Sequence, residues 1–218
     1  MKSINESTSK NINVRITFTE PLLGTAPADE YIYETYVRKN APDAATLEEE
    51  ISTLGADAVI EKGMTVFHRS ADGAPILYDY QIKGFFKDTC GALARVKTTE
   101  SAKLRAYKKI IDGLIFPYPR QIKLVANDEI KMRQRPLRAN TPVGEKTALA
   151  ICEELPAGTT CEFAITLLDP AHERVVREWL DYGALRGMGQ WRNSGAGRFT
   201  WVEVTASEAQ EASKVAVA

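Results

Sequence analysis

Residues 12–19, INVRITFT, alternate strictly between apolar and polar side chains. Because successive side chains of a strand point to opposite faces, this pattern predicts a strand buried on one face only. A second alternating segment at 159–168 follows a turn signal at 156–158, and FTWVEV at 199–204 predicts a closing strand. Sheet strands are therefore expected at both ends of the chain.

Helical periodicity marks the region between these strands. Residues 42–54 predict an acidic helix, and apolar residues fall on one helical face over 80–96 and over 101–113. A last helix is expected to begin at Asp169-Pro170, an N-cap residue followed by a proline suited to the first turn. Short extended segments are expected around 114–116, 120–125 and 129–135, with a long loop or irregular hairpin at 135–146 and a further loop at 21–30. Without a regular βα repeat, this order favours an α+β fold with an antiparallel sheet over a doubly wound one.

The length of 218 residues suits one large domain or two small ones. No linker is long enough to divide the chain, so we expect a single elaborated domain over residues 1–205. The tail at 206–218 has no capping signal and little to bury, and is expected to be disordered.

Several classes of protein are disfavoured by composition. The longest apolar runs, such as 113–116, are far shorter than the roughly 20 residues of a membrane span, and the polar stretch 1–11 does not resemble a secretory signal. Three widely spaced cysteines form neither a disulfide framework nor a zinc knuckle, and there are two histidines. We therefore expect buried or half-buried thiols in a reducing cytoplasm, with no membrane partner, metal or cofactor.

Charge is segregated along the chain although the net charge is −1. Residues 19–80 hold twelve acidic and four basic side chains, whereas residues 81–138 hold fourteen basic and five acidic ones. Such segregation is typical of distinct surfaces, one of them electropositive, although solvated helix faces beside acidic neighbours would give the same count.

The segment GMGQWRNSGAGRF, residues 187–199, concentrates glycine between the last helix and the last strand. Glycine is placed where the backbone bends through positive φ or approaches something closely. A phosphate-binding P-loop needs a Lys-Ser/Thr pair that is missing here, and a dinucleotide fingerprint needs glycines that follow a strand and open a helix. Both are excluded by this sequence and this order.

Two interpretations of the segment remain open. In one, an electropositive loop lies along a phosphate backbone: the glycines allow close approach, Arg192 and Arg198 supply charge, and Trp191 stacks on a base. In the other, the segment is a tight helix-to-strand turn in which Trp191 is part of the core. The glycines concerned are Gly187, Gly189, Gly195 and Gly197.

In its layout the segment resembles the glycine-rich loop of the RAMP superfamily, the RNA-binding proteins of CRISPR systems. Its crRNA-binding backbone subunits are the most similar in layout. Residues 81–93, QIKGFFKDTCGAL, resemble the segment in which Lys-Gly leads into the helix that faces the guide RNA. Residues 155–168 resemble the turn and strand before the last helix, and the N-terminal strand with its Gly24 loop also fits. The similarity extends, in chain order, over about two thirds of the sequence.

This resemblance implies a modified ferredoxin-like (RRM-like) antiparallel sheet with helices and insertions, which grips single-stranded RNA beside copies of itself or other CRISPR-type subunits. By position, Lys83, Lys87, the four glycines and Arg198 would contact the RNA. Trp191 and Arg192 are added from the interpretation of the glycine segment as a phosphate-binding loop, and Arg135 and Arg138 from the basic stretch 81–138. FFKDTCGAL departs from the family's usual small-residue and arginine pattern, which favours a stand-alone or mobile-element relative over a standard effector subunit.

Three functions stay open at this point. The first is a binding protein for single-stranded RNA or single-stranded DNA, with no catalysis. The second is a RAMP-type endoribonuclease, because some relatives cut RNA with an aspartate in the loop after the first strand, where Asp29 lies. Other relatives use a histidine, but His68 and His172 are expected on the surface, and Asp79 is a weaker candidate. The third is a protein-interaction component, such as a phage-encoded mimic that engages a CRISPR complex.

Overall fold

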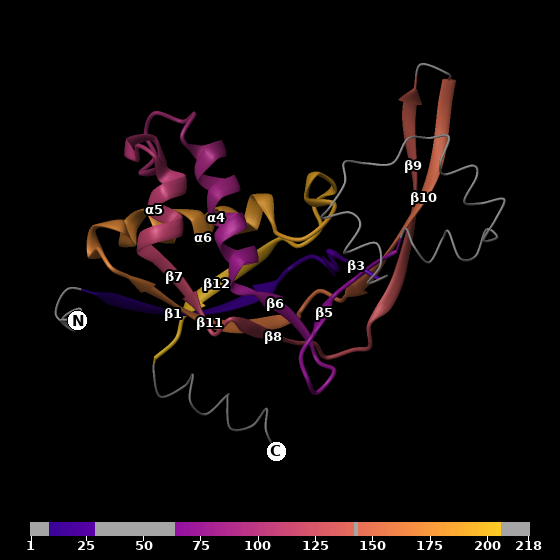
Figure 1. Ribbon diagram of the computed structural model, residues 1–218, viewed down its shortest axis with the longest axis horizontal. Coiled ribbons are helices and arrows are strands. Elements are labelled where there is room, and N and C mark those ends of the chain that lie inside the picture. Colours follow the sequence, from indigo (N-terminus) through magenta and orange to yellow (C-terminus); the bar gives the residue numbers. More distant parts are fainter. Residues whose placement is uncertain (1–8, 29–63, 142–143, 206–218) are drawn as a thin grey trace.

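The computed structural model describes residues 9–28, 64–141 and 144–205 (Figure 1). The helix expected at 42–54, the candidate Asp29 and the tail at 206–218 lie outside these residues. Side chains at 137–149 are also outside the described part.

The main sheet joins strands from both ends of the chain. Its order is β12-β1-β11-β8-β6-β5, and β7 also pairs with β11. Every pairing in this sheet is antiparallel. The strands are β1 (Lys10–Phe18), β5 (His68–Arg69), β6 (Pro75–Tyr78), β7 (Ile115–Tyr118), β8 (Gln121–Val125), β11 (Thr160–Leu167) and β12 (Phe199–Glu203). The α+β class with an antiparallel sheet is thus confirmed, as are the strands expected at the two ends.

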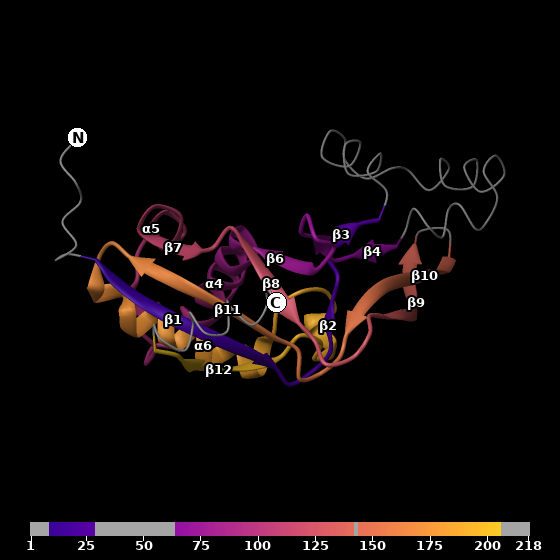
Figure 2. The ribbon, with the colours of Figure 1, turned by 90° about the horizontal axis from the view of Figure 1, so that it is seen from below.

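Three helices pack on one face of this sheet (Figures 1 and 2). They are α4 (Asp79–Leu93), α5 (Tyr107–Leu114) and α6 (Glu173–Arg186), and the short 3-10 turns are Ser101–Lys103, Pro170–His172 and Arg192–Ser194. Asp169 caps the turn before α6 as expected, since its side chain accepts a hydrogen bond from the N–H of Ala171. No helix in the described ranges combines the length and hydropathy needed to cross a membrane.

The core lies between the helices and the alternating strand β1. Ile12, Val14, Ile16 and Phe18 are fully buried, while their polar neighbours face away from the helices. Trp179 of α6 is also fully buried. Burial of each such side chain contributes about 1.5–3 kcal/mol, so this interface is the main source of stability in the sheet. The three cysteines are buried and unpaired, which confirms the expectation for the thiols.

The helix expected over 101–113 is wrong in its first half. The α-helix begins at Tyr107 because Ala106 takes a left-handed conformation with φ 52°. Before it, the carboxylate of Glu178 accepts hydrogen bonds from the N–H groups of Glu100 and Ser101. These contacts attach the segment before α5 to α6, where it forms the 3-10 turn Ser101–Lys103 in place of the first half of the expected helix.

A second sheet carries a hairpin that extends away from the helices (Figure 1). Its order is β2-β10-β4-β3, and β9 pairs with β10. The strands are β2 (Leu22–Leu23), β3 (Ala26–Pro27), β4 (Thr65–Val66), β9 (Lys131–Thr141) and β10 (Gly144–Leu155). The loop expected at 21–30 therefore contains two short strands, and the irregular connection expected at 135–146 is a regular antiparallel hairpin. Pro136 is tolerated because β9 pairs with β10 alone among the described strands.

Candidate nucleic-acid interface

The glycine segment turns through positive φ at all four of its glycines. The φ angles are 70° at Gly187, 83° at Gly189, 87° at Gly195 and 69° at Gly197. A residue with a Cβ is disfavoured in this region by about 1–2 kcal/mol, so glycine is the expected residue at each position. The sequence-based expectation of a positive-φ bend is confirmed.

The two ends of the glycine segment cross each other in direct backbone contact. A Cβ on Gly197 would lie 1.9 Å from the carbonyl oxygen of Met188, and one on Gly187 would lie 2.6 Å from that of Ala196. The N–H of Met188 donates to the carbonyl of Gly197 at 3.0 Å. The need for glycine at 187 and 197 therefore has an explanation inside the protein. We call this region, residues 187–188 and 196–197, the crossing.

Between these ends, residues 190–195 form a more open tip. Around a Cβ on Gly195, the nearest described atoms belong to the Arg198 side chain, at 3.6 Å. Trp191 is partly buried, packs against Leu23, Cys152 and Ala196, and has φ 51°. It is thus neither fully in the core nor fully exposed, and it shares features of both interpretations.

The base of the hairpin contacts this tip. Arg135 of β9 donates from Nη1 to the hydroxyl of Ser194 at 2.6 Å, and its guanidinium lies 5.7 Å from the centroid of the Trp191 ring. Arg135 is exposed. The structure therefore brings Arg135 to the adjacent residues Trp191 and Arg192, from which it is distant in the sequence.

An ion cluster joins α4, α6 and the glycine segment. The Asp88 carboxylate accepts a hydrogen bond from Arg186 Nε at 2.8 Å and one from Arg192 Nη1 at 2.9 Å. Arg186 also donates from Nη1 to Asn193 at 2.7 Å. The hydrogen bond from Arg186, with the charge of Arg192 nearby, holds the pKa of Asp88 below its ordinary value. Two guanidinium groups against one carboxylate leave a positive excess.

Three hollows meet at this ion cluster. Their volumes are about 430, 790 and 580 Å³, and each pair shares one of Asp88, Arg186 and Arg192 as a lining residue. Together they form a depression that runs from α5, over α4 and the end of α6, to the base of the hairpin; we call it the groove. Its basic lining residues are Lys87, Arg95, Lys108, Arg135, Arg186 and Arg192.

The two predicted lysines of α4 are held by α5. Lys83 donates to the carbonyl of Asp112 at 3.1 Å, and its Nζ lies 4.5 Å from the centroid of the Phe116 ring. Lys87 forms an ion pair with the Asp112 carboxylate at 2.7 Å. Lys87 also lines the groove, whereas Lys83 lies beside β7.

The other predicted contacts are dispersed. Arg198 is exposed at the exit of the segment, where its carbonyl accepts hydrogen bonds from Thr19 and Glu20. Arg138 belongs to β9, but its side chain is outside the described part.

Asp88 and Arg186 belong to the ion cluster but were not among the residues predicted from the sequence. Arg186 was detectable as a cation directly before Gly187, whereas no motif pointed to Asp88.

The candidate catalytic residues do not converge. Asp29 lies outside the described residues, so the endoribonuclease alternative stays a prediction. His68 and His172 are partly buried rather than exposed, because His68 contacts Tyr78 and Tyr80 while His172 packs against its capping turn. Asp79 faces Arg120, with 3.6 Å between Oδ1 and Nη1.

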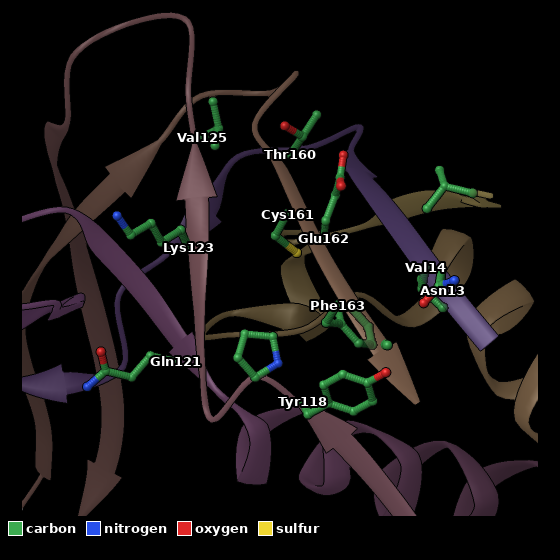
Figure 3. A pocket seen from close by; sticks show the side chains of 13 residues that line it. Asn13, Val14, Tyr118, Gln121, Lys123, Val125, Thr160, Cys161, Glu162 and Phe163 are labelled. Carbon is green, nitrogen blue, oxygen red and sulfur yellow. The ribbon is translucent and has the colours of Figure 1, made fainter. Parts of the chain in front are cut away.

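A further hollow of about 440 Å³ lies where β8 and β11 diverge (Figure 3). Its walls include Tyr118, Val125 and Phe163. Its charged lining residues are already paired: Lys123 bonds to Asp72, and Glu162 to Arg15. This hollow therefore lacks the cationic excess of the groove and is a poorer match for a phosphate backbone.

Comparison with solved structures shows where this fold occurs. A chain of the type III-B Cmr-beta complex, which was solved bound to cognate target RNA, matches with a TM-score of 0.51 and 10% identity. The match covers 91% of this chain and spans 60% of the length of that chain. A chain of a type IV-B CRISPR complex matches with a TM-score of 0.43 and 15% identity, over 90% of this chain and 91% of that one. No protein-family model matches the sequence, and no curated protein does. The α+β fold described above is thus also that of a CRISPR-complex subunit.

Proposed function

We propose that this chain is a RAMP-like subunit that holds single-stranded RNA. The order β1, α4 and α5, β7, β11, α6, β12 along the chain follows the β-α-β-β-α-β pattern of a ferredoxin-like domain. The sheet order β12-β1-β11, with β7 on the far side of β11, supports the same assignment. The hairpin β9–β10 is then an insertion between the second and third strands of the motif.

The observation that carries the proposal is the groove. It combines a positive excess at Asp88, Arg186 and Arg192 with a partly exposed tryptophan and an open, glycine-containing tip. Phosphate groups are bound by guanidinium groups and backbone N–H groups, and bases stack on aromatic rings. A single strand presents both phosphates and exposed base faces to the protein. In a duplex the bases are stacked and paired, so that only the phosphates would be accessible to the groove.

The proposed roles differ among the predicted residues. Arg192, Arg135 and Arg198 contact phosphates, and the exposed part of the Trp191 ring contacts a base. Gly195 leaves room at the tip, Gly189 lets the segment pass close to Leu22 and Leu23, and Gly187 and Gly197 shape the crossing. Lys87 adds charge to the groove while it stays paired with Asp112. As in the family that it resembles, the subunit would assemble with copies of itself or with other CRISPR-type subunits, as a backbone-type subunit or as a stand-alone relative.

Direct binding measurements test this proposal. Fluorescence anisotropy with unstructured RNA and DNA oligomers should show binding that weakens with salt, with a slope of about −0.7 per phosphate contact on a log–log plot. RNA should bind more tightly than DNA of the same sequence if the protein contacts the 2′-hydroxyl groups. An absence of RNA binding at low salt would contradict the proposal, and light scattering with and without RNA would report assembly.

A further inference from the structure

One part of the groove is a distinct compartment between the start of α4 and the glycine segment. It has a volume of about 430 Å³ and lies between the strand β3, the strand β5 and the tip. Gly189 and Arg192 line both this compartment and the neighbouring hollow that contains Trp191. Its size is at the lower end of small-ligand sites.

Aromatic rings form one wall of this compartment. Tyr80 stacks on Tyr78 with the ring centroids 5.4 Å apart and the planes 15° from parallel. His68 lies edge-on to Tyr78 at 4.9 Å, and its Nε2 is 3.3 Å from the hydroxyl of Tyr80. These contacts fix the rings in the protein itself, so little rotamer freedom is left for a ligand to remove. Tyr80 is nevertheless 49% exposed.

Hydrogen bonds hold the opposite wall in place. Gln81 accepts from the N–H of Tyr78 at 2.7 Å and donates from Nε2 to the hydroxyl of Thr25 at 2.9 Å. This side chain therefore ties the segment at Thr25–Pro27 to the first turn of α4. The remaining wall includes Leu77 and Met188, which are buried and apolar.

The charge of this compartment is suited to an uncharged, planar group. Asp88 at its inner end is already paired with two arginines. Burial lowers the pKa of His68, so its imidazole is neutral near pH 7, with one ring nitrogen a donor and the other an acceptor. Its Nε2 already faces the hydroxyl of Tyr80. The one cation that lines this compartment, Arg192, is paired with Asp88, so a phosphate here would also face a carboxylate and a neutral ring, whereas a nucleobase would meet ring faces and polar edges.

We infer that this compartment holds one unstacked nucleobase of the bound RNA, with the adjoining phosphate at Arg192. The inference rests on the proposed function and adds a base-binding subsite to it. Tyr80 supplies the stacking wall, and His68 and Asp88 face the hydrogen-bonding edge of the base. The subunit would then grip the strand by one base as well as by its backbone.

Paired variants and paired ligands test this subsite. Tyr80→Ala should weaken binding of an RNA oligomer about fivefold or more, the effect of losing one stacked base, while Tyr80→Phe should stay close to the parent. With an abasic sugar-phosphate oligomer of the same length, Tyr80→Ala and the parent should bind equally. Arg192→Ala should weaken both ligands.

The outcomes separate this subsite from the proposed function. If the parent binds RNA but Tyr80→Ala binds as tightly as Tyr80→Phe, the subsite is wrong and the function stands. If the parent binds no RNA, the function itself fails. Should Tyr80→Ala not fold, oligomers with a single 2-aminopurine at successive positions give the answer with the parent. One position should change its fluorescence strongly on binding, and a uniform response along the strand would overturn the inference.

Discussion

The crossing and the tip of the glycine segment are adjacent, but their glycines meet different demands. At the crossing, Gly187 and Gly197 are buried, and a Cβ on either would enter a backbone carbonyl of the same segment. At the tip, Gly195 has a flexible arginine side chain as its nearest described neighbour. Glycine density alone therefore marks a fold requirement at the crossing and a proposed binding surface at the tip, and substitutions can separate the two.

Gly197→Ala should have the largest effect of the variants considered. The new methyl group would lie 1.9 Å from the Met188 carbonyl oxygen, at φ 69°, so the crossing must open. We expect a loss of at least about 3 kcal/mol in the free energy of unfolding, measured by urea denaturation. Gly195→Ala is the matched control, with about 1 kcal/mol lost to its positive φ. Equal losses at the two positions would remove the distinction between crossing and tip.

Charge reversal at Arg192 and Arg198 should weaken RNA binding and leave the fold intact. The double variant Arg192→Glu with Arg198→Glu replaces two cations near the groove by two anions. We expect RNA affinity to fall by at least about tenfold at low salt, because the two cations that would displace counterions from RNA phosphates are lost and the new carboxylates repel the phosphates. Circular dichroism and the urea midpoint check the fold. A folded variant with unchanged affinity would place the binding surface elsewhere, and an unfolded one would favour the tight-turn interpretation of the tip.

Asp88→Asn tests how the tip is attached to the helices. Asp88 accepts hydrogen bonds from Arg186 and Arg192, so its loss should reduce the free energy of unfolding by about 1 kcal/mol at pH 7. Because its pKa is lowered in the folded state, this stabilisation is present above the ordinary carboxyl pKa of about 4 and is lost as the pH falls through the folded value. The difference between parent and variant should therefore shrink in acid. A difference that grows as the pH falls would contradict the assignment.

Local patterns predicted the parts of the fold that depend on one face of one element. The alternation at 12–19 and the apolar face of the helix after Asp169 both correspond to buried surfaces in the structure. What failed depended on distant partners: Glu178 accepts hydrogen bonds from the segment before α5, and pairing with β10 makes a regular strand of residues 135–141. The ion cluster belongs to the same class, since Asp88 and Arg192 are 104 positions apart and neither lies in a motif that implies the other. The periodicity of a segment predicts which of its faces is buried. Which residues meet in the candidate site depends instead on which elements the fold brings together.

Lys87→Ala should have the smallest effect on RNA affinity, within about threefold of the parent at 0.1 M salt. Its ammonium is paired with Asp112 at 2.7 Å, so an RNA phosphate gains little there, and exposed ion pairs are worth little in water. Asp112→Asn is the informative companion, because it frees Lys87 without removing it. Binding should then be equal to or tighter than that of the parent, with a steeper dependence on salt by up to about one phosphate contact. If Lys87→Ala instead weakens binding as much as Arg192→Ala, the lysine is a direct contact, as its position in the resembling segment implies. The strand would then cross α4 on the side of α5 as well as at the tip.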